Sequence, residues 1–170
     1  MEKEKSISIN ILRIILIILL LCTFFIIFGF SSQNGEQSSG ISRKVTEIIL
    51  KVSVNYNQLE EEEKEIVLHR TESIIRKIAH FSIYTVVGFL LMGLLSTYKL
   101  KEKWRIIITI VIGILYAISD EFHQSFSPGR SPKITDVYID TLGIILGVLL
   151  VILIRMIYKK IKTEYCKDVT

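Results

Sequence analysis

Cysteine is nearly absent from this 170-residue chain, which has only Cys22 and Cys166. Because the first lies inside an apolar run and the second near the C-terminus, we expect neither a disulfide nor a thiolate metal cluster. The sequence also lacks the patterns H-E-x-x-H, G-x-S-x-G and C-x-x-C, which are typical of zinc proteases, serine hydrolases and redox centres. Residue spacing therefore predicts no metal site and no cofactor.

A continuous basic surface is lacking as well. The net charge of +4 is modest, and the basic residues are not grouped with interleaved aromatics, so nucleic-acid binding is not expected. Half of the residues are hydrophobic, and the mean hydropathy is +0.47. A chain of this length and composition is typical of a single membrane domain, here residues 1–170, rather than of a soluble protein.

Four apolar runs predict membrane-spanning helices. The runs 14–30 and 78–98 are long enough to cross a bilayer. The runs 106–119 and 141–154 have only 14 residues each. At ~1.5 Å per residue a run of this length covers about 21 Å, less than the ~30 Å hydrocarbon core. These helices must therefore continue through their acidic ends, and the predicted spans cover residues 11–30, 76–98, 104–126 and 134–156.

The distribution of basic residues predicts that both termini are cytoplasmic. Twelve Lys and Arg residues lie in the N-terminal segment, between the second and third spans, and in the C-terminal part from Arg155, including the tail 157–170. Only Arg130 and Lys133 lie between the third and fourth spans. The first run could instead be a cleaved signal peptide, but its length and the absence of an A-x-A-like site favour an uncleaved anchor. We expect a multi-pass protein of the plasma membrane.

The first loop, residues 31–75, is then external, and its sequence predicts two amphipathic helices. Apolar residues recur at helical spacing at Ile41, Val45, Ile48, Ile49 and Val52. Asn57 and Glu60 resemble a capping box that begins a second helix running toward Arg76. These helices could lie on the outer membrane surface or cap the bundle, or they could form a lid or a ligand platform.

A pair of glycines marks the fourth span. Gly143 and Gly147 form a G-x-x-x-G pattern, which lets membrane helices approach closely. We expect this pair to pack within the bundle, although the same pattern could serve dimerisation.

Polar residues gather at the outer ends of all four spans. Asp120 and Glu121 lie near a helix C-terminus, where the dipole opposes them, and charge inside a membrane costs at least about 2 kcal/mol, so both need partners. We expect a cationic partner from Arg76, Lys77, Arg130 or a protonated His123. Intramembrane acids usually mark sites, so Asp120 should be functional and lie within reach of His80 or of a shared water or ion. The predicted ligand-binding residues are Ser32, Gln33, Arg76, Lys77, His80, Tyr84, Asp120, Glu121, His123, Gln124, Arg130, Asp136 and Asp140.

Several of these residues also have a structural interpretation. Arg76 and Lys77 could extend to lipid head groups, and His80 could simply bond between helices. Asp136 could favour a helix N-terminus, where the dipole welcomes an anion. Arg130 could clamp the third and fourth helices through a salt bridge. We favour a bidentate grip of Arg130 on a phosphate or carboxylate of a ligand, which Arg130→Lys would abolish.

Three segments resemble the VanZ-like family of small bacterial membrane proteins. They are "FSSQ" after the first span, "RKIAHFSIYTVVGFLL" in the second and "SDEFHQSFSPGRSPKITDVYIDTLG" across the third and fourth, and the match covers about residues 31–149. The resemblance implies a role in the cell envelope, because founding relatives confer resistance to glycopeptide antibiotics such as teicoplanin. Asp140 stands where most members have Asn, which implies that its charge is less essential.

The expected fold is all-α, a polytopic four-helix transmembrane bundle with amphipathic helices in the first external loop. The expected function is to bind or modify an outer-leaflet amphiphile with an anionic head, such as a wall precursor, a phospholipid or a lipoglycopeptide. A membrane-embedded hydrolase or transferase is the alternative, with His80, Asp120, Glu121 and His123 as catalytic candidates. A proton-coupled transporter is less favoured, because polar groups at one depth give no pathway across the bilayer.

Overall fold

The chain forms five helices, and no strand occurs, over the residues that the computed structural model describes: 2–32, 35–52, 56, 58–129 and 132–168. The helices are α1 (Glu2–Ser31), α2 (Gly35–Lys51), α4 (Glu61–Ser96), α5 (Glu102–Gln124) and α6 (Ile134–Asp168). The expected all-α fold is confirmed.

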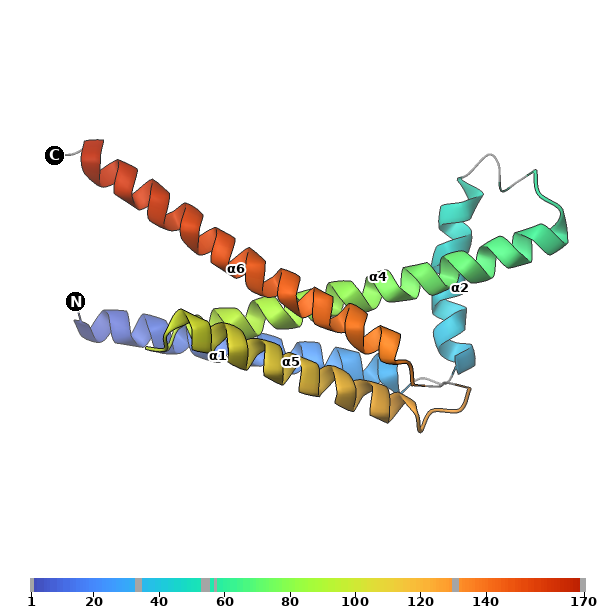
Figure 1. Ribbon diagram of the computed structural model, residues 1–170, viewed down its shortest axis with the longest axis horizontal. Helices are drawn as coiled ribbons and strands as arrows, with labels where there is room; N and C mark the ends of the chain where they lie inside the picture. The colour runs from blue at the N-terminus through green and yellow to red at the C-terminus, as the bar shows by residue number, and fades with distance from the viewer. Residues whose placement is uncertain (1, 33–34, 53–55, 57, 130–131, 169–170) are drawn as a thin grey trace.

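Four of these helices are long and apolar enough to cross a membrane. They contain the candidate spans Ser6–Ser31, Glu61–Ser96, Glu102–Gln124 and Ile134–Tyr165. In Figure 1 the four helices run alongside one another, whereas α2 stands across one end of the bundle. The chain is therefore a multi-pass helical membrane protein.

Helix α4 is longer than the sequence suggested, because it joins the second expected span to the helix expected before it. No glycine or proline interrupts residues 61–87, so nothing in the sequence stops the helix between them. Its start is a capping box of Glu60 and Glu63. Asn57, where we expected this start, lies outside the described residues. The N-terminal part of α4 extends past the other long helices and packs against α2.

The close crossing of α4 and α6 organises the bundle, and glycine makes it possible. A Cβ atom built on Gly147 would overlap the carbonyl oxygen of Thr85, and one on Gly143 would overlap that of Phe81. Small residues of this kind allow membrane helices to pack backbone against backbone. The G-x-x-x-G pair therefore packs inside this chain, as expected, and Ile144 between the two glycines is fully buried.

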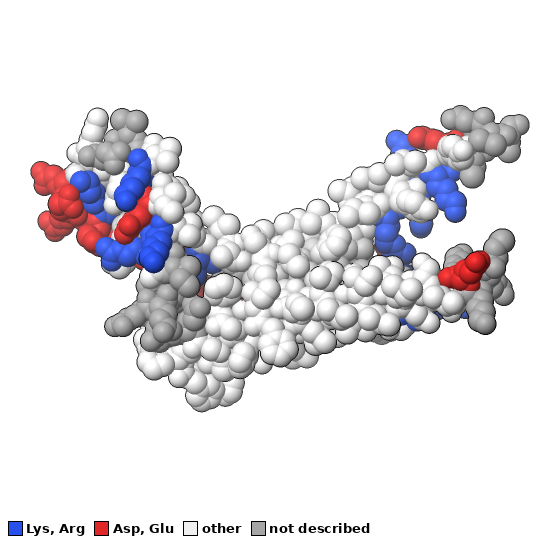
Figure 2. All heavy atoms as spheres, turned by 180° about the vertical axis from the view of Figure 1, so that it is seen from behind, with Lys and Arg blue, Asp and Glu red and all other residues white. Residues whose placement is uncertain are grey.

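The two ends of the bundle differ in charge. At one end Arg13 of α1 donates to the carbonyl oxygen of Thr97 at 2.7 Å, and Arg155 of α6 donates to Ser96 Oγ at 3.3 Å. We call this the basic end, because Figure 2 shows mainly Lys and Arg there, over the diverging helix ends. At the other end, the polar end, α1 and α5 finish, α6 begins, and charges of both signs surround α2 and the start of α4. Between the two ends the surface shown is uncharged, as lipid contact requires.

Candidate functional site

The polar end contains a cavity of about 440 Å³ between α1, α2, α4 and α5. Its apolar walls are formed by Ile26, Ile27, Phe30, Val45, Ile75, Ala79 and Ile83. Its polar lining consists of Ser31, Ser42, Arg76, His80, Tyr84, Asp120 and Gln124. An apolar cavity with a few converging polar groups is the usual form of a small-molecule site.

Side chains from three helices meet beside this cavity. His80 of α4, Asp120 of α5 and Asp140 of α6 each place one nitrogen or oxygen atom within 4.8 Å of the others. His80 Nδ1 lies 3.4 Å from Asp140 Oδ1. We call these residues the three-helix cluster. The expected proximity of His80 and Asp120 is confirmed. Asp140 is also close to them, but it is 0% exposed and is not among the residues that line the cavity.

Asp120 is held by neutral donors rather than by the expected cation. Ser31 Oγ donates to its Oδ1 at 2.5 Å, and Gln124 Nε2, one turn along α5, donates to its Oδ2 at 3.1 Å. Among the described residues, no Lys or Arg side chain forms an ion pair with Asp120. The end of α1 packs close enough to α5 for Ser31 to take this role, which the sequence analysis missed by choosing Ser32 and Gln33.

Glu121 is also buried, but it points to the start of α6. Its Oε2 accepts a hydrogen bond from the backbone N–H of Lys133 at 2.8 Å. A carboxylate is favoured at this place, because the helix dipole is positive at its N-terminus. Asp136 lies in the first turn of the same helix, where Thr135 Oγ1 donates to it at 3.3 Å. Glu121 therefore links the end of α5 to the start of α6, whereas the hydrogen bond of Asp136 stays within α6.

Glu72, which the sequence analysis did not select, links α4 to α2 beside the cavity and is also the partner of Arg76. Arg76 Nη2 donates to Glu72 Oε1 at 3.0 Å, and Ser42 Oγ of α2 donates to the same oxygen at 3.2 Å. Glu72 is only 5% exposed. The available signal was its spacing of four residues from Arg76. Lys77 is exposed and does not line the cavity.

His123 packs on α1 rather than with Asp120. Its ring stacks on Phe28 with centroids 4.5 Å apart, and its Nε2 lies 3.1 Å from Ser32 Oγ. Ser32 and His123 therefore form a pair outside the cavity lining. Tyr84 is fully buried beside His80, with ring centroids 6.5 Å apart.

Two of the predicted ligand-binding residues, Gln33 and Arg130, lie outside the described residues.

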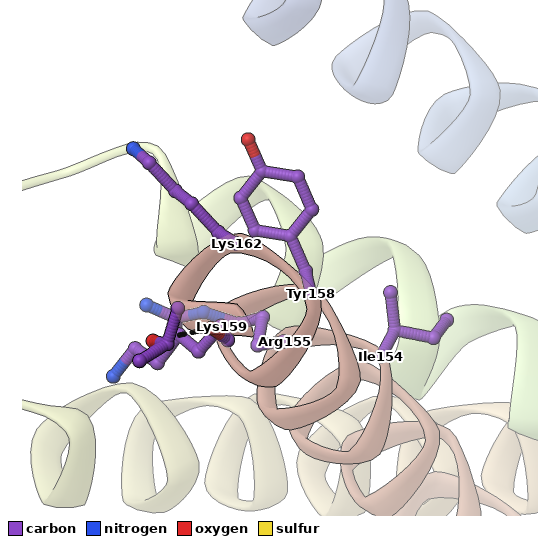
Figure 3. Close-up of a pocket in the computed structure, with 6 residues that line it drawn as sticks. Ile154, Arg155, Tyr158, Lys159 and Lys162 are labelled. Carbon is purple, nitrogen blue, oxygen red and sulfur yellow. Dashed lines mark hydrogen bonds between the residues drawn. The ribbon is translucent and has the colours of Figure 1, made fainter. Parts of the chain in front are cut away.

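A second hollow, of about 770 Å³, lies at the basic end, where α6 diverges from the other helices. Among the described residues its lining comes from α6, through Ile154, Arg155, Tyr158, Lys159, Lys162 and Thr163 (Figure 3). Basic side chains at this spacing share one helix face and are suited to the phosphates of a membrane surface. Because no second helix contributes a group, this hollow is a weaker candidate for a specific site than the cavity.

These features define a class: a four-span membrane protein with a buried His–Asp cluster next to an apolar cavity at one end. A family model described as VanZ/LLP1 matches residues 16–155, so the chain belongs to this family. Comparison with curated proteins and with solved structures gave no significant match.

Proposed function

We propose that the protein binds an amphiphile of the outer leaflet, with its acyl chain in the cavity and its anionic head at the polar end. The observation that carries this proposal is the composition of the cavity. Its walls are aliphatic and aromatic, and its polar groups come from Arg76, His80, Asp120 and Gln124. An amphiphile needs both kinds of surface, whereas a soluble metabolite would leave the apolar walls uncovered.

The proposed side of the membrane follows from the charge of the two ends. Basic residues in short loops favour the cytoplasm, and they gather at the basic end. The cavity then opens near the external head groups of the plasma membrane. Family membership and the resemblance described above support a cell-envelope role. Wall precursors, phospholipids and lipoglycopeptides are the candidate ligands, and reduced susceptibility to teicoplanin is the candidate phenotype.

The test is to fill the cavity and measure lipid occupancy. Purified protein in nanodiscs is exposed to phosphatidylglycerol with a photoreactive acyl chain, and cross-linking is quantified by mass spectrometry. Ala79→Trp places a large ring in the cavity wall and should reduce labelling about tenfold, which corresponds to ~1.4 kcal/mol of binding free energy. The control is Ile78→Trp, because Ile78 is 57% exposed and does not line the cavity. Equal labelling of the two variants and the wild type would refute the proposal.

A membrane-embedded hydrolase or transferase is the second candidate, and the three-helix cluster is the observation that favours it. An imidazole beside two carboxylates can accept and donate protons during an acyl or phosphoryl transfer. Release of the head group from the same phosphatidylglycerol by the wild type, and not by Asp120→Asn, would establish this function. Binding without release supports the binding protein.

A further inference from the structure

The three-helix cluster has the geometry of a metal site. Two ligands that lie about 2.1 Å from a tetrahedral metal ion are roughly 3.4 Å apart. His80 Nδ1 and Asp140 Oδ1 are 3.4 Å apart, and one ligand atom from each of His80, Asp120 and Asp140 lies within 4.8 Å of the other two. Spacing along the sequence could not reveal this site, because each ligand comes from a different helix.

Asp140 supplies the independent observation that a ligand is required here. It is 0% exposed, and neither of its carboxylate oxygens forms a hydrogen bond within the described part of the chain. His80 Nδ1, which faces it, is also buried without a hydrogen-bond partner. Most buried polar atoms in proteins have a hydrogen-bond partner, and the 3.4 Å contact with His80 compensates the Asp140 charge only when the imidazole is protonated. A bound cation would satisfy these atoms together.

The surroundings of Asp120 are those of a metal ligand. Ser31 and Gln124 donate to its two oxygens, at 2.5 Å and 3.1 Å. Hydrogen bonds of this kind orient a ligating carboxylate and leave a further lone pair on each oxygen for the ion. Among the described residues no Lys or Arg side chain occupies the oxygens of Asp120, since Arg76, which also lines the cavity, bonds to Glu72 instead.

We propose that His80, Asp120 and Asp140 bind one divalent cation with the preferences of Zn²⁺ or Mn²⁺. An imidazole with two carboxylates suits these ions better than Ca²⁺, which prefers six to eight oxygen ligands. Three protein ligands leave at least one coordination position open. His80 and Asp120 line the cavity, so that position faces the amphiphile, and the ion would hold an anionic head that the bare carboxylates would repel. This last step alone rests on the proposed function.

The experiment uses the full-length protein without a histidine tag, stripped with a chelator and titrated in detergent with Zn²⁺ alone and with Mn²⁺ alone. Equilibrium dialysis with elemental analysis should give one ion per chain. His80→Ala and Asp140→Asn should each weaken binding at least about a hundredfold, because each removes a direct ligand and loss of a mere supporting partner already costs 10- to 100-fold. The control is His69→Ala, since His69 is exposed and outside the cluster.

A second readout rests on the wild type, whose result does not depend on how the variants fold. Co²⁺ bound by an imidazole and carboxylates absorbs visible light differently from hydrated Co²⁺, so the wild type and His69→Ala should show a new band that both cluster variants lose. Wild-type binding no tighter than that of His80→Ala, or an unchanged cobalt spectrum, would overturn the proposal in favour of a protonated carboxyl. Because these titrations contain no phosphatidylglycerol, a negative result would not bear on the proposal that the cavity binds an amphiphile. Failure of the Ala79→Trp experiment would likewise leave the metal site standing.

Discussion

Asp120 shows, at the scale of single residues, how a carboxylate can be kept inside a helical membrane protein. A hydroxyl from the end of α1 and an amide from the next turn of α5 donate to it, so it needs no neighbouring cation for its hydrogen bonds. Hydrogen bonds to a charged acceptor are stronger than neutral ones, typically by about twofold. Asp120 therefore links α1 to α5 at the level of the cavity.

Removal of the Ser31 hydroxyl should destabilise the protein. Ser31→Ala leaves one oxygen of a buried carboxylate without this donor, so the free energy of unfolding should fall by about 1–3 kcal/mol. Ser32→Ala is the matched control, because Ser32 is exposed and bonds to Phe28 of its own helix; its effect should stay within about 0.5 kcal/mol. Denaturant titration in detergent measures both values. Equal effects of the two substitutions would show that the contact of Ser31 with Asp120 contributes nothing.

The sequence predicted part of the candidate site and missed the rest for a physical reason. Polar groups in a membrane attract one another, which was sufficient to pair His80 with Asp120. Which face each helix turns to its neighbour depends on packing across the bundle, and no single helix encodes that. His123 is three residues from Asp120, yet it turns toward Phe28 of α1. Ser31 was passed over for its neighbour Ser32 for the same reason.

At the scale of helices, the length of α4 follows from the absence of breaking residues between its charged start and its apolar part. Charges in residues 61–77 suggested a separate loop helix, because charge signals departure from the hydrocarbon core. Charge does not end a helix, however, and no glycine or proline interrupts residues 61–87, so α4 continues through them. The sequence thus predicted the all-α fold and its four spans, but it did not predict that the second span and the helix before it form one continuous helix.

Helix α2 forms one wall of the cavity, through Ser42 and Val45. Arg43 joins it to α4 by an ion pair with Glu65 at 2.7 Å, and the nearby carboxylate raises the pKa of the Arg43 guanidinium. Apolar side chains at Ile48 and Ile49 remain exposed on α2. A helix with such a face is suited to the membrane interface, where amphiphile heads lie.

The α4–α6 crossing should be sensitive to a single methyl group. Gly147→Ala places its Cβ against the backbone of Thr85 and Phe89, which cannot move aside as a flexible side chain could. We expect a loss of about 1–3 kcal/mol in the free energy of unfolding, the usual effect of overpacking. Gly29→Ala is the control, because no atom lies within 4 Å of the position that a Cβ would occupy there. It should be neutral or stabilise by up to about 1 kcal/mol. Thermal unfolding in detergent distinguishes the two, and a tolerated Gly147→Ala would mean that the helices can separate there without loss.

At the scale of the whole molecule, the difference in charge between the basic end and the polar end predicts how the bundle is oriented across the membrane. Arg13 and Arg155 bond to Thr97 and Ser96, next in sequence to the lysines of the α4–α5 connection, whereas the cavity lies where α1 and α5 finish. A cell membrane discriminates between such ends, because basic residues in short loops are retained in the cytoplasm. The side on which the cavity opens therefore decides which leaflet can supply its ligand.

Cysteine labelling can test this direction, with Cys22 and Cys166 first replaced by serine. Glu62→Cys lies at the exposed start of α4, near the polar end, and Lys103→Cys lies at the exposed start of α5, at the basic end. Twelve basic residues lie near the termini and in the α4–α5 connection, against two in the α5–α6 connection, so we expect Glu62→Cys outside and Lys103→Cys inside. A membrane-impermeant maleimide should therefore label Glu62→Cys in intact cells and Lys103→Cys only after permeabilisation. The reverse pattern would contradict the orientation and make the inner leaflet the source of any amphiphile. The cavity and the three-helix cluster would be unaffected by that result, because both follow from contacts inside the bundle and not from its orientation.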